Sequence, residues 1–515
     1  IPEVFLSNLK TATHWVLKRN QLKLLLFYTI TEEGISTINT AIHFCNIIKV
    51  SAYETVRRSA GNSLLILVHY LNKFEKNEVA VELLRALEIE GHKFTEYIPY
   101  YLGRLILFLE DKEINELIDD LKEKIKTAKS PVKSLLLKTV GTAIAYSSID
   151  PGVKNESSTY QKMGEKSEYI SGKWDLRQKF INILLSGMAD PDFRVNQTAI
   201  TTIGRTGFGS ELISIDRKKE LFDLMVKKIL ILTRQSERDD LNFLSDSAAY
   251  NYIYKFISDY EMTYGAIVPA NLKKYAFFAG TFDPFTLSHR EIARLIRDLG
   301  YEVYFSVDEF SWSKKTLPNK VRRSILNMSV AGEENMFLFP DSIPVNIGND
   351  KDIETLKDAF GGEITIICGS DVILNATAYE SGKKAIRKLP HIVFLRNESE
   401  DNIKIISERL DDFKILDLPD YLKTISSSQI RKNIDENRDI STLIDSLAQE
   451  YIYENGFYQR TPIDKYLAQY NALKTEDVTE CTPELLKLFS QCKVDIKKVE
   501  KLIKDVFSKD SGRAL

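Results

Sequence analysis

From Lys273 onward, the sequence changes from helical periodicity to short apolar runs that alternate with amphipathic stretches, and this change constrains the fold most. The runs are rich in β-branched and aromatic residues and predict strands, whereas the stretches between them predict helices. Strands that alternate with helices form a parallel sheet covered on both faces, with ligands at the carboxyl ends of the strands. We predict strands at 275–279, 302–307, 337–339, 364–368, 391–395 and 413–416, and helices at 288–299, 320–330, 352–360 and 372–388.

Residues 1 to about 260 show only helical periodicity, and three of their segments share one spacing. Val56, Val132 and Val195 are each followed four positions later by Ala or Leu, and nine positions later by Leu or Gly. A small residue one turn into a helix and a Gly near its end permit helices to stack closely. The pattern resembles HEAT-type helical repeats, whose units bury their apolar faces against neighbours. The uneven distance between the three segments leaves an irregular helical bundle as the alternative.

We therefore expect a multidomain chain in three parts. An all-α, HEAT-like region would span 1–265, an α/β domain 272–460, and a short helical extension 461–515. The polar segment from Ser147 to Ser171 predicts a loop within the helical region, because the helical pattern resumes at Trp174. A chain of 515 residues is long enough for about two to four domains with cores of their own.

The composition argues against several classes of function. A net charge of −3 gives no overall basic field that would attract nucleic acid. No uninterrupted apolar window of about 18 residues predicts a membrane span, and no signal-peptide pattern is present. The four cysteines lie far apart without a CxxC pair, which predicts a reducing, cytoplasmic compartment and no zinc site. The chain begins at Ile1 and not at Met, which leaves its N-terminal neighbour open.

The first predicted strand leads directly into a loop and a helix, over Gly280-Thr281-Phe282-Asp283-Pro284-Phe285-Thr286-Leu287-Ser288-His289. Gly280 would let the backbone pass close to a ligand. The helix that begins near Leu287 would present unpaired amides and a positive dipole end to phosphate. Thr286 and His289 are three positions apart and share one face of the first turn, where both could face a bound anion. The structural alternative is a capping Thr beside a partly exposed His.

A second motif, Ile425-Ser426-Ser427-Ser428-Gln429-Ile430-Arg431, lies just before a helix predicted at 430–433. Serines at a helix start are ordinary caps, but Arg431 adds a planar, permanently charged group that suits phosphate oxygens. The first motif resembles the G-x-F-D-P-x-(H/T)-x-G-H signature of adenylyl- and cytidylyltransferases, and the second resembles their I-S-S-T/S-x-I-R motif. Ser288 stands where that family usually has Gly, and its side chain could crowd the nucleotide.

Two further segments resemble adenylyltransferases that act on pyridine mononucleotides. Trp312-Ser313-Lys314-Lys315, followed by Arg322-Arg323, is similar to a basic segment after the second strand of those enzymes. Lys314 or Lys315 would then neutralise phosphate charge, and a solvated loop is the alternative. After the fourth predicted strand, Gly369-x-Asp371 is similar to their G-x-D element.

Two aromatic positions near that element receive different interpretations. Tyr379 takes the place where those enzymes often carry a Trp that stacks near the pyridine ring. A Tyr ring can also stack, which makes Tyr379 a candidate acceptor contact. His391 opens a predicted strand and is most simply structural.

The resemblance covers about residues 273 to 460 and implies a Rossmann-like nucleotidyltransferase domain. An acceptor phosphate would attack the α-phosphorus of ATP and release pyrophosphate without a covalent intermediate, so catalysis would rest on alignment and charge neutralisation. His289 and Thr286 would stabilise the α-phosphoryl group, and Arg431 would hold the departing pyrophosphate. Mg²⁺ would arrive with the triphosphate. The nucleotide-binding residues would be Gly280, Thr281, Phe282, Asp283, Gly369, Asp371, Ser426, Ser427 and Ser428.

Several identities of the acceptor stay open. Nicotinate or nicotinamide mononucleotide is favoured, which would place the reaction in NAD biosynthesis, and a phosphopantetheine-type acceptor is the nearest rival. Cytidylyltransferases would be expected to carry R-T-x-G-I-S-T-T, a form that Leu422-Lys423-Thr424 lacks. A different class of function is a helical scaffold that carries a weakly active, nucleotide-sensing transferase domain. In either case the helical region could bind a protein partner, whereas no membrane or nucleic-acid partner is expected.

Overall fold

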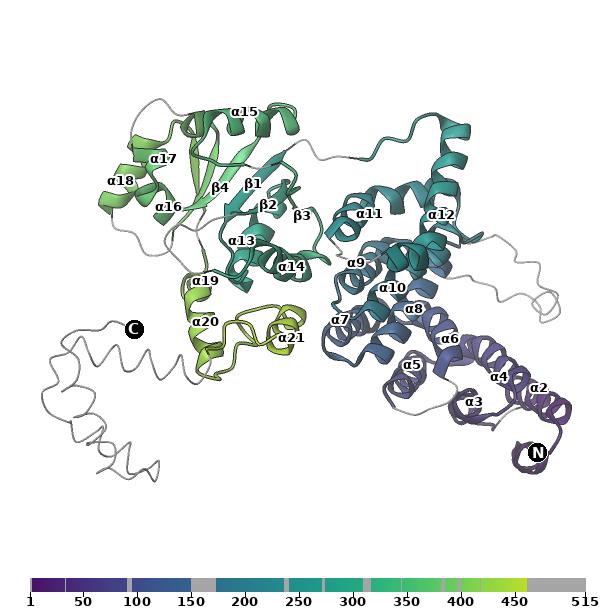
Figure 1. Cartoon of the computed structure of the whole chain (residues 1–515). Helices are drawn as coiled ribbons and strands as arrows, with labels where there is room; N and C mark the ends of the chain where they lie inside the picture. The colour runs from purple at the N-terminus through teal and green to yellow at the C-terminus, as the bar shows by residue number, and fades with distance from the viewer. Residues whose placement is uncertain are drawn as a thin grey trace, which may run out of the picture. The chain divides into compact units, whose positions relative to one another are not determined.

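We describe the chain from a computed structural model, which is drawn in Figure 1. The described residues are 2–32, 34–89, 95–149, 173–235, 240–270, 274–308, 316–343, 345–380, 385–395, 400–416 and 418–460. The helical extension predicted at 461–515 and most of the predicted loop at 147–171 lie outside these ranges. Among the described residues, no helix has the length and apolar character that crossing a membrane requires.

In the part of the chain that the structure describes, the N-terminal region is helical and contains no strand, as its periodicity predicts. Asn72 caps α5 through a reciprocal pair of bonds with Glu75, and Pro99 and Pro131 lie in the first turns of α6 and α8. The helices are α1 (Pro2–Thr11), α2 (Trp15–Thr31), α3 (Thr37–Val50), α4 (Glu54–Leu67), α5 (Lys73–Glu88), α6 (Ile98–Leu105), α7 (Asp111–Thr127), α8 (Ser130–Ser147), α9 (Arg177–Met188), α10 (Phe193–Thr202), α11 (Ile215–Gln235) and α12 (Asp240–Tyr264).

These helices stack in two layers (Figure 1). Each of α2, α4, α6, α8, α10 and α12 packs against the next in that series, while α3 packs on α5, and α7, α9 and α11 pack in succession. A Cβ on Gly141 of α8 would lie 2.2 Å from Thr202 Cγ2 of α10, and one on Gly204 would lie 2.6 Å from Ala249 Cα of α12. Glycine therefore permits these close helix contacts, and the arrangement is compatible with HEAT-type repeats.

The second region contains a six-stranded parallel sheet in the order β3-β2-β1-β4-β5-β6. Each strand starts and ends within one residue of its predicted position, because the apolar runs are short and have polar or turn residues at their ends. The strands are β1 (Tyr275–Gly280), β2 (Glu302–Val307), β3 (Met336–Leu338), β4 (Thr365–Gly369), β5 (His391–Phe394) and β6 (Phe413–Leu416).

Helices cover both faces of this sheet (Figure 1). Phe277 of β1 packs in a core with residues of α15, α16 and α18, whereas the ring of Phe278 lies 6.2 Å from that of His289 in α13. The side chains of neighbouring residues in one strand thus pack on opposite faces of the sheet. The helices of this region are α13 (Leu287–Asp298), α14 (Asn319–Val330), α15 (Asp350–Ala359), α16 (Ser370–Asn375), α17 (Thr377–Glu380), α18 (Glu400–Arg409), α19 (Asp420–Lys423), α20 (Ser427–Asp435) and α21 (Ser446–Glu454).

Two helix predictions need correction. The single helix predicted at 372–388 is interrupted, because Ala376 adopts an extended conformation that separates α16 from α17, and a 3₁₀ turn at Ala385–Lys388 follows later. The helix predicted at 430–433 already begins at Ser427, with Ser426 as its N-cap. In the second case, serines favour caps and turns, so the first helical turn from Ser427 resembles a loop in the sequence.

Both regions belong to one compact unit that extends from Ile1 to Phe457. Within it, α21 packs against both α7 and α14, and α11 packs against β3. The side chain of Lys227 in α11 binds both carboxylate oxygens of Glu302 at the start of β2, at 2.8 and 2.9 Å. The helical region is therefore in direct contact with the sheet region, and the last described helix contacts both.

Candidate active site

The candidate site lies at the carboxyl ends of β1 and β4. The strand order reverses between these two neighbours, and at such a switch point the loops that follow the strands diverge and leave room for a ligand. β1 ends at Gly280 and β4 ends at Gly369. The loop from Gly280 to His289 and the Gly369-x-Asp371 element therefore start from adjacent strand ends, as the predicted sheet requires.

The loop after β1 is anchored from inside by Phe282. This residue has a φ of 44°, and its buried ring lies 5.4 Å from that of Phe285 and 6.0 Å from that of Phe305. A Cβ on Gly280 would lie 2.9 Å from the Phe282 ring. Glycine is thus needed at 280 to make room for Phe282, which differs from the predicted reason, a close approach of the backbone to a ligand. The ring itself is enclosed and leaves only the backbone of Phe282 for a nucleotide.

A buried arginine fixes the outer side of the same loop. Arg322 of α14 is fully buried and donates to the carbonyl oxygens of Thr281, Asp308 at 2.7 Å and Leu317 at 2.9 Å. Its neighbour Arg323 donates to Phe339 O at 2.9 Å. Both side chains therefore bind the protein's own carbonyl groups, and the phosphate role that the resemblance implies for this segment rests on Lys314 or Lys315.

Thr286 and His289 form a reciprocal cap at the start of α13. The Thr286 hydroxyl accepts from the His289 amide at 3.2 Å, and His289 Nδ1 accepts from the Thr286 amide at 3.1 Å. The Thr286 hydroxyl also lies 3.0 Å from His289 Nδ1. The predicted shared face is confirmed, but buried Thr286 is committed to the cap and to the imidazole. It therefore positions His289 and does not present its hydroxyl to an anion.

The cap also sets the tautomer of His289. A backbone amide can only donate, so Nδ1 must be unprotonated when it accepts from Thr286, and the proton of the neutral ring lies on Nε2. The ring is flanked by Phe282 at 5.1 Å and Phe285 at 5.4 Å between centroids. His289 is thus held in one orientation with a donor on the side away from the cap.

The first-turn amides of α13 are less available than the sequence suggested. The Leu287 amide donates to Leu443 O at 2.9 Å, and the His289 amide donates to Thr286 Oγ1. Two groups that were predicted to point at phosphate are therefore already bonded within the protein. The positive end of the helix dipole still faces the loop, but side chains and not these amides must supply the direct contacts.

The second motif binds directly to the first. Ser427 Oγ donates to Pro284 O at 2.8 Å, and Arg431 donates to Asp283 O and, through Nη2, to Ser428 Oγ at 3.1 Å. Arg431 Nη1 also lies 3.8 Å from a carboxylate oxygen of buried Asp283. The Arg431 side chain retains 29% of its exposure. The two motifs thus form one site, with a partly exposed guanidinium beside the loop.

Ser288 provides a further link between the motifs. Its side chain is buried, and Oγ donates to Leu422 O at 3.0 Å, just after the start of α19. The Ser288 hydroxyl therefore points to a carbonyl group of the protein and not toward the space where a nucleotide would crowd against it. The serine joins the start of α13 to the segment that leads into the second motif.

The remaining predicted site residues differ in position. Asp371 is exposed beside the end of β4, and a Cβ on Gly369 would lie 2.4 Å from its carboxylate.

Tyr379 is fully buried, and its hydroxyl lies 3.2 Å from Nε2 of buried His391. Burial lowers the pKa of His391 to about 4. The Tyr379 ring belongs to the core and cannot stack on a ligand where it lies, whereas the structural interpretation of His391 is confirmed.

One acidic residue at the site escaped the sequence reasoning, and two basic residues lie outside the described ranges. Asp308 follows β2, and its amide donates to Gly280 O at 3.1 Å. Burial raises the pKa of its carboxyl group, and the nearby Arg322 partly offsets this effect. Its position as the first polar residue after a predicted strand was the signal that could have found it. Lys314 and Lys315 lie outside the described residues.

A sequence model of the cytidylyltransferase-like family matches residues 277–433. That match begins within β1 and includes both motifs, so it covers the site that the hydrogen bonds assemble. Residues 277–433 form a nucleotidyltransferase domain. This assignment agrees with the parallel sheet, with its order reversed between β1 and β4, and with the ligand position that such a sheet predicts.

The nucleotidyltransferase domain is similar in sequence to complete bacterial proteins. One is a probable nicotinate-nucleotide adenylyltransferase of Chlorobium phaeobacteroides, 28% identical over 200 residues that cover 36% of this chain and 100% of that protein. Another protein with the same name, from Caldicellulosiruptor saccharolyticus, is 23% identical over 212 residues, which cover 36% of this chain and 99% of that protein. A solved Plasmodium falciparum nicotinic acid mononucleotide adenylyltransferase complexed with NaAD is 19% identical, with a TM-score of 0.30, and covers 36% of this chain and 97% of that one.

Proposed function

We propose that the nucleotidyltransferase domain transfers AMP from ATP to nicotinate or nicotinamide mononucleotide and releases pyrophosphate. The proposal rests on one observation: Arg431 and Ser427 of the second motif bond to Asp283 and Pro284 of the first. These bonds place Arg431 and His289 beside the same loop. Such a pair can donate hydrogen bonds to two points of a triphosphate, and Arg431 also brings a positive charge. The names of the relatives, which are probable nicotinate-nucleotide adenylyltransferases, support a pyridine mononucleotide as the acceptor.

In the proposed reaction, an oxygen of the acceptor phosphate attacks the α-phosphorus and the bond to the β-phosphate oxygen breaks. His289 would donate its Nε2 proton in a hydrogen bond to an α-phosphoryl oxygen, where charge increases in the transition state. Arg431 would donate to the departing pyrophosphate, assisted by Ser428, while Thr286 keeps the imidazole oriented. The nucleotide would enter as its Mg²⁺ complex. Because the attacking oxygen is already ionised at neutral pH, no general base is required.

The test is a pyrophosphate-release screen of ATP and CTP against nicotinate mononucleotide, nicotinamide mononucleotide and phosphopantetheine. We expect turnover with ATP and a pyridine mononucleotide, and a loss of about 10²-fold or more in kcat for His289→Ala. Exposed His14, which caps α2 far from the site, supplies the control His14→Ala, with unchanged kcat. Calorimetric binding of ATP without any turnover would instead support the nucleotide-sensing alternative, and full activity of His289→Ala would refute the role of this residue.

A further inference from the structure

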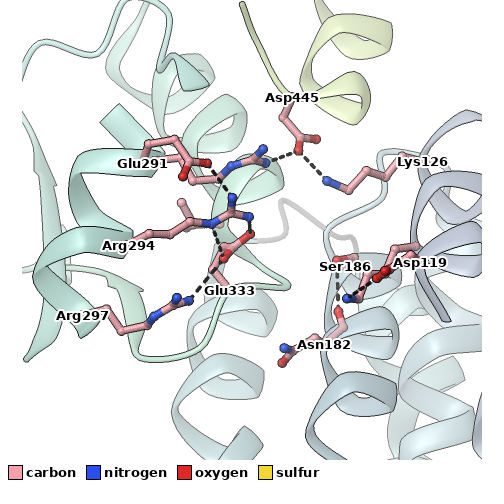
Figure 2. A network of polar contacts seen from close by, with 12 residues as sticks. Asp119, Lys126, Asn182, Ser186, Glu291, Arg294, Arg297, Glu333 and Asp445 are labelled. Atoms are coloured by element: carbon pink, nitrogen blue, oxygen red, sulfur yellow. Dashed lines mark hydrogen bonds and ion pairs between the residues drawn. The ribbon is translucent and has the colours of Figure 1, made fainter. Parts of the chain in front are cut away.

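The face of α13 that points away from the sheet carries a row of arginines. Arg290, Arg294 and Arg297 lie at helical spacing. Figure 2 shows the acidic side chains beside this row, which are Glu291, Glu333 and Asp445. Arg294 binds Glu333 through Nε at 3.0 Å and Nη2 at 2.5 Å. Arg290 Nη1 binds Asp445 Oδ2 at 2.6 Å. Because Arg290 directly follows His289, its bond to Asp445 restrains the same first turn of α13 that carries His289.

Asp445 connects that turn to the helical region. Its side chain is 1% exposed, and Oδ2 accepts from both Arg290 and Lys126 of α7, the latter at 2.5 Å (Figure 2). Its other oxygen, Oδ1, accepts from the Leu447 amide at 3.1 Å and so caps α21. Two residues earlier, Leu443 O accepts the Leu287 amide. The segment 443–445 thus holds the first turn of α13 at two points, on either side of His289.

The helical region holds this segment from the other side. Lys133 of α8 binds Asp190 at 3.0 Å, where both side chains are buried, and Glu450 of α21 at 3.2 Å. The turn after α14 is packed so closely against α9 that a Cβ on Gly332 would lie 2.2 Å from Ser186 Oγ. Residues that the family match does not include therefore set the place of α21 and its capping aspartate.

We propose that Asp445 is a positioning residue that sets the first turn of α13, and with it His289, and that Lys126 of the helical region sets Asp445. The catalytic consequence rests on the proposed function, whereas the structural linkage does not. A buried carboxylate between two cations is little screened by solvent, so its removal leaves Arg290 and Lys126 to repel each other. Removal of Lys126 alone leaves the pair with Arg290 but removes the ion pair that joins Asp445 to α7.

The linkage can be tested on the full chain by the imidazole Cε1–H signal of His289. The chain has six histidines, so the signal can be assigned by its loss in His289→Gln. Asp445→Asn keeps an oxygen that can cap α21 but loses the charge, and Lys126→Met keeps the length of the side chain. We expect both variants to shift the His289 signal, and Lys122→Met, which removes an exposed pair with Asp119 on the same helix, to leave it in place. An unshifted signal in both variants would overturn the proposal.

Kinetics then separate positioning from general damage. A donor that acts in the transition state affects kcat more than ground-state binding, so we expect kcat to fall by about tenfold in Asp445→Asn and about threefold in Lys126→Met. The KM for ATP should change less than about twofold, with an unchanged stoichiometry of ATP binding. The double variant should be no slower than Asp445→Asn, because both substitutions disrupt one linkage.

The outcomes distinguish the two proposals. Equal kcat in Lys126→Met and Lys122→Met, or a stoichiometry that falls in step with kcat, would refute the positioning role. If the unaltered chain turns over none of the substrate pairs, the proposed function fails, and the His289 signal still decides whether the helical region positions α13.

Discussion

At the scale of single residues, the interaction between Thr286 and His289 fixes the orientation of the imidazole at the candidate site. The Thr286 hydroxyl contacts both the amide and Nδ1 of His289. Thr286→Val keeps the shape of the side chain but removes the cap, which costs about 1 kcal/mol, and leaves the imidazole less restrained. We expect kcat to fall by about tenfold or more and Thr286→Ser to recover most of it. Steady-state kinetics of the two variants, compared at equal folded fraction, measure this. Equal rates for Val and Ser at 286 would contradict the assignment.

Residues of the site differ in how far the sequence could reveal them. Gly280 and His289 are predicted by a local strand–loop–helix pattern, and Arg431 is predicted by a separate local motif at a helix start. The function of Arg322 could not be found in this way, since its three carbonyl partners come from three separate segments. The burial of Tyr379 was also hidden, because a tyrosine in a broken helix has no periodicity that says which way it points. Non-local contacts therefore account for most of what the sequence did not predict.

At the scale of elements, close packing of helices is the feature that glycine controls. A Cβ at Gly141 would lie 2.2 Å from Thr202 and 2.6 Å from Thr206, so Gly141→Ala should destabilise the helical region by about 1–3 kcal/mol through overpacking. Gly207→Ala is the matched control, because the nearest atom to its Cβ would be 3.9 Å away. Thermal unfolding followed by circular dichroism measures both. A Tm for Gly141→Ala as high as that of Gly207→Ala would show that α8 and α10 are not in such close contact.

Elements also explain why the fold could be predicted better than its details. The six strands are short, almost wholly apolar and closely bounded, so local composition predicts them. The two-layer stacking of the helical region depends on which helix each apolar face meets, and a 3.6-residue period does not contain that information. The extended Ala376, which divides α16 from α17, likewise has no Pro or Gly next to it that would indicate a break in the helix from the sequence.

At the scale of the whole molecule, the contact between the helical region and the nucleotidyltransferase domain contains a buried lysine. Lys228 of α11 donates to Val330 O, at the carboxyl end of α14, at 2.6 Å. Burial lowers the pKa of Lys228 to about 7, and Glu333 partly opposes this effect. Between this value and its ordinary pKa, the unfolded chain binds the proton more strongly than the folded chain. The contribution of Lys228 to the free energy of unfolding must therefore rise with pH across that window.

This sign gives a test that involves both regions. From pH 7 to pH 9, the free energy of unfolding of the unaltered chain should rise relative to that of Lys228→Met. The difference should grow by on the order of 1–2 kcal/mol per pH unit at most. Tm values of both proteins across this range measure the difference. Parallel curves would mean that Lys228 keeps its charge in the contact. Lys228→Met is a suitable reference because Met fills a similar volume without a titrating group.

The bonds between the two motifs also have a consequence for the order in which the protein is made. Arg431 and its partner Asp283 are 148 residues apart in the chain, and Ser427 and Pro284 are 143 apart. During synthesis, where domains fold from the N-terminus onward, the helical region is complete long before the second motif emerges from the ribosome. The loop of the first motif must therefore wait, without its arginine and serine partners, until almost the whole described chain has been translated. A nascent chain arrested before Ile425 would carry the whole helical region but no assembled site.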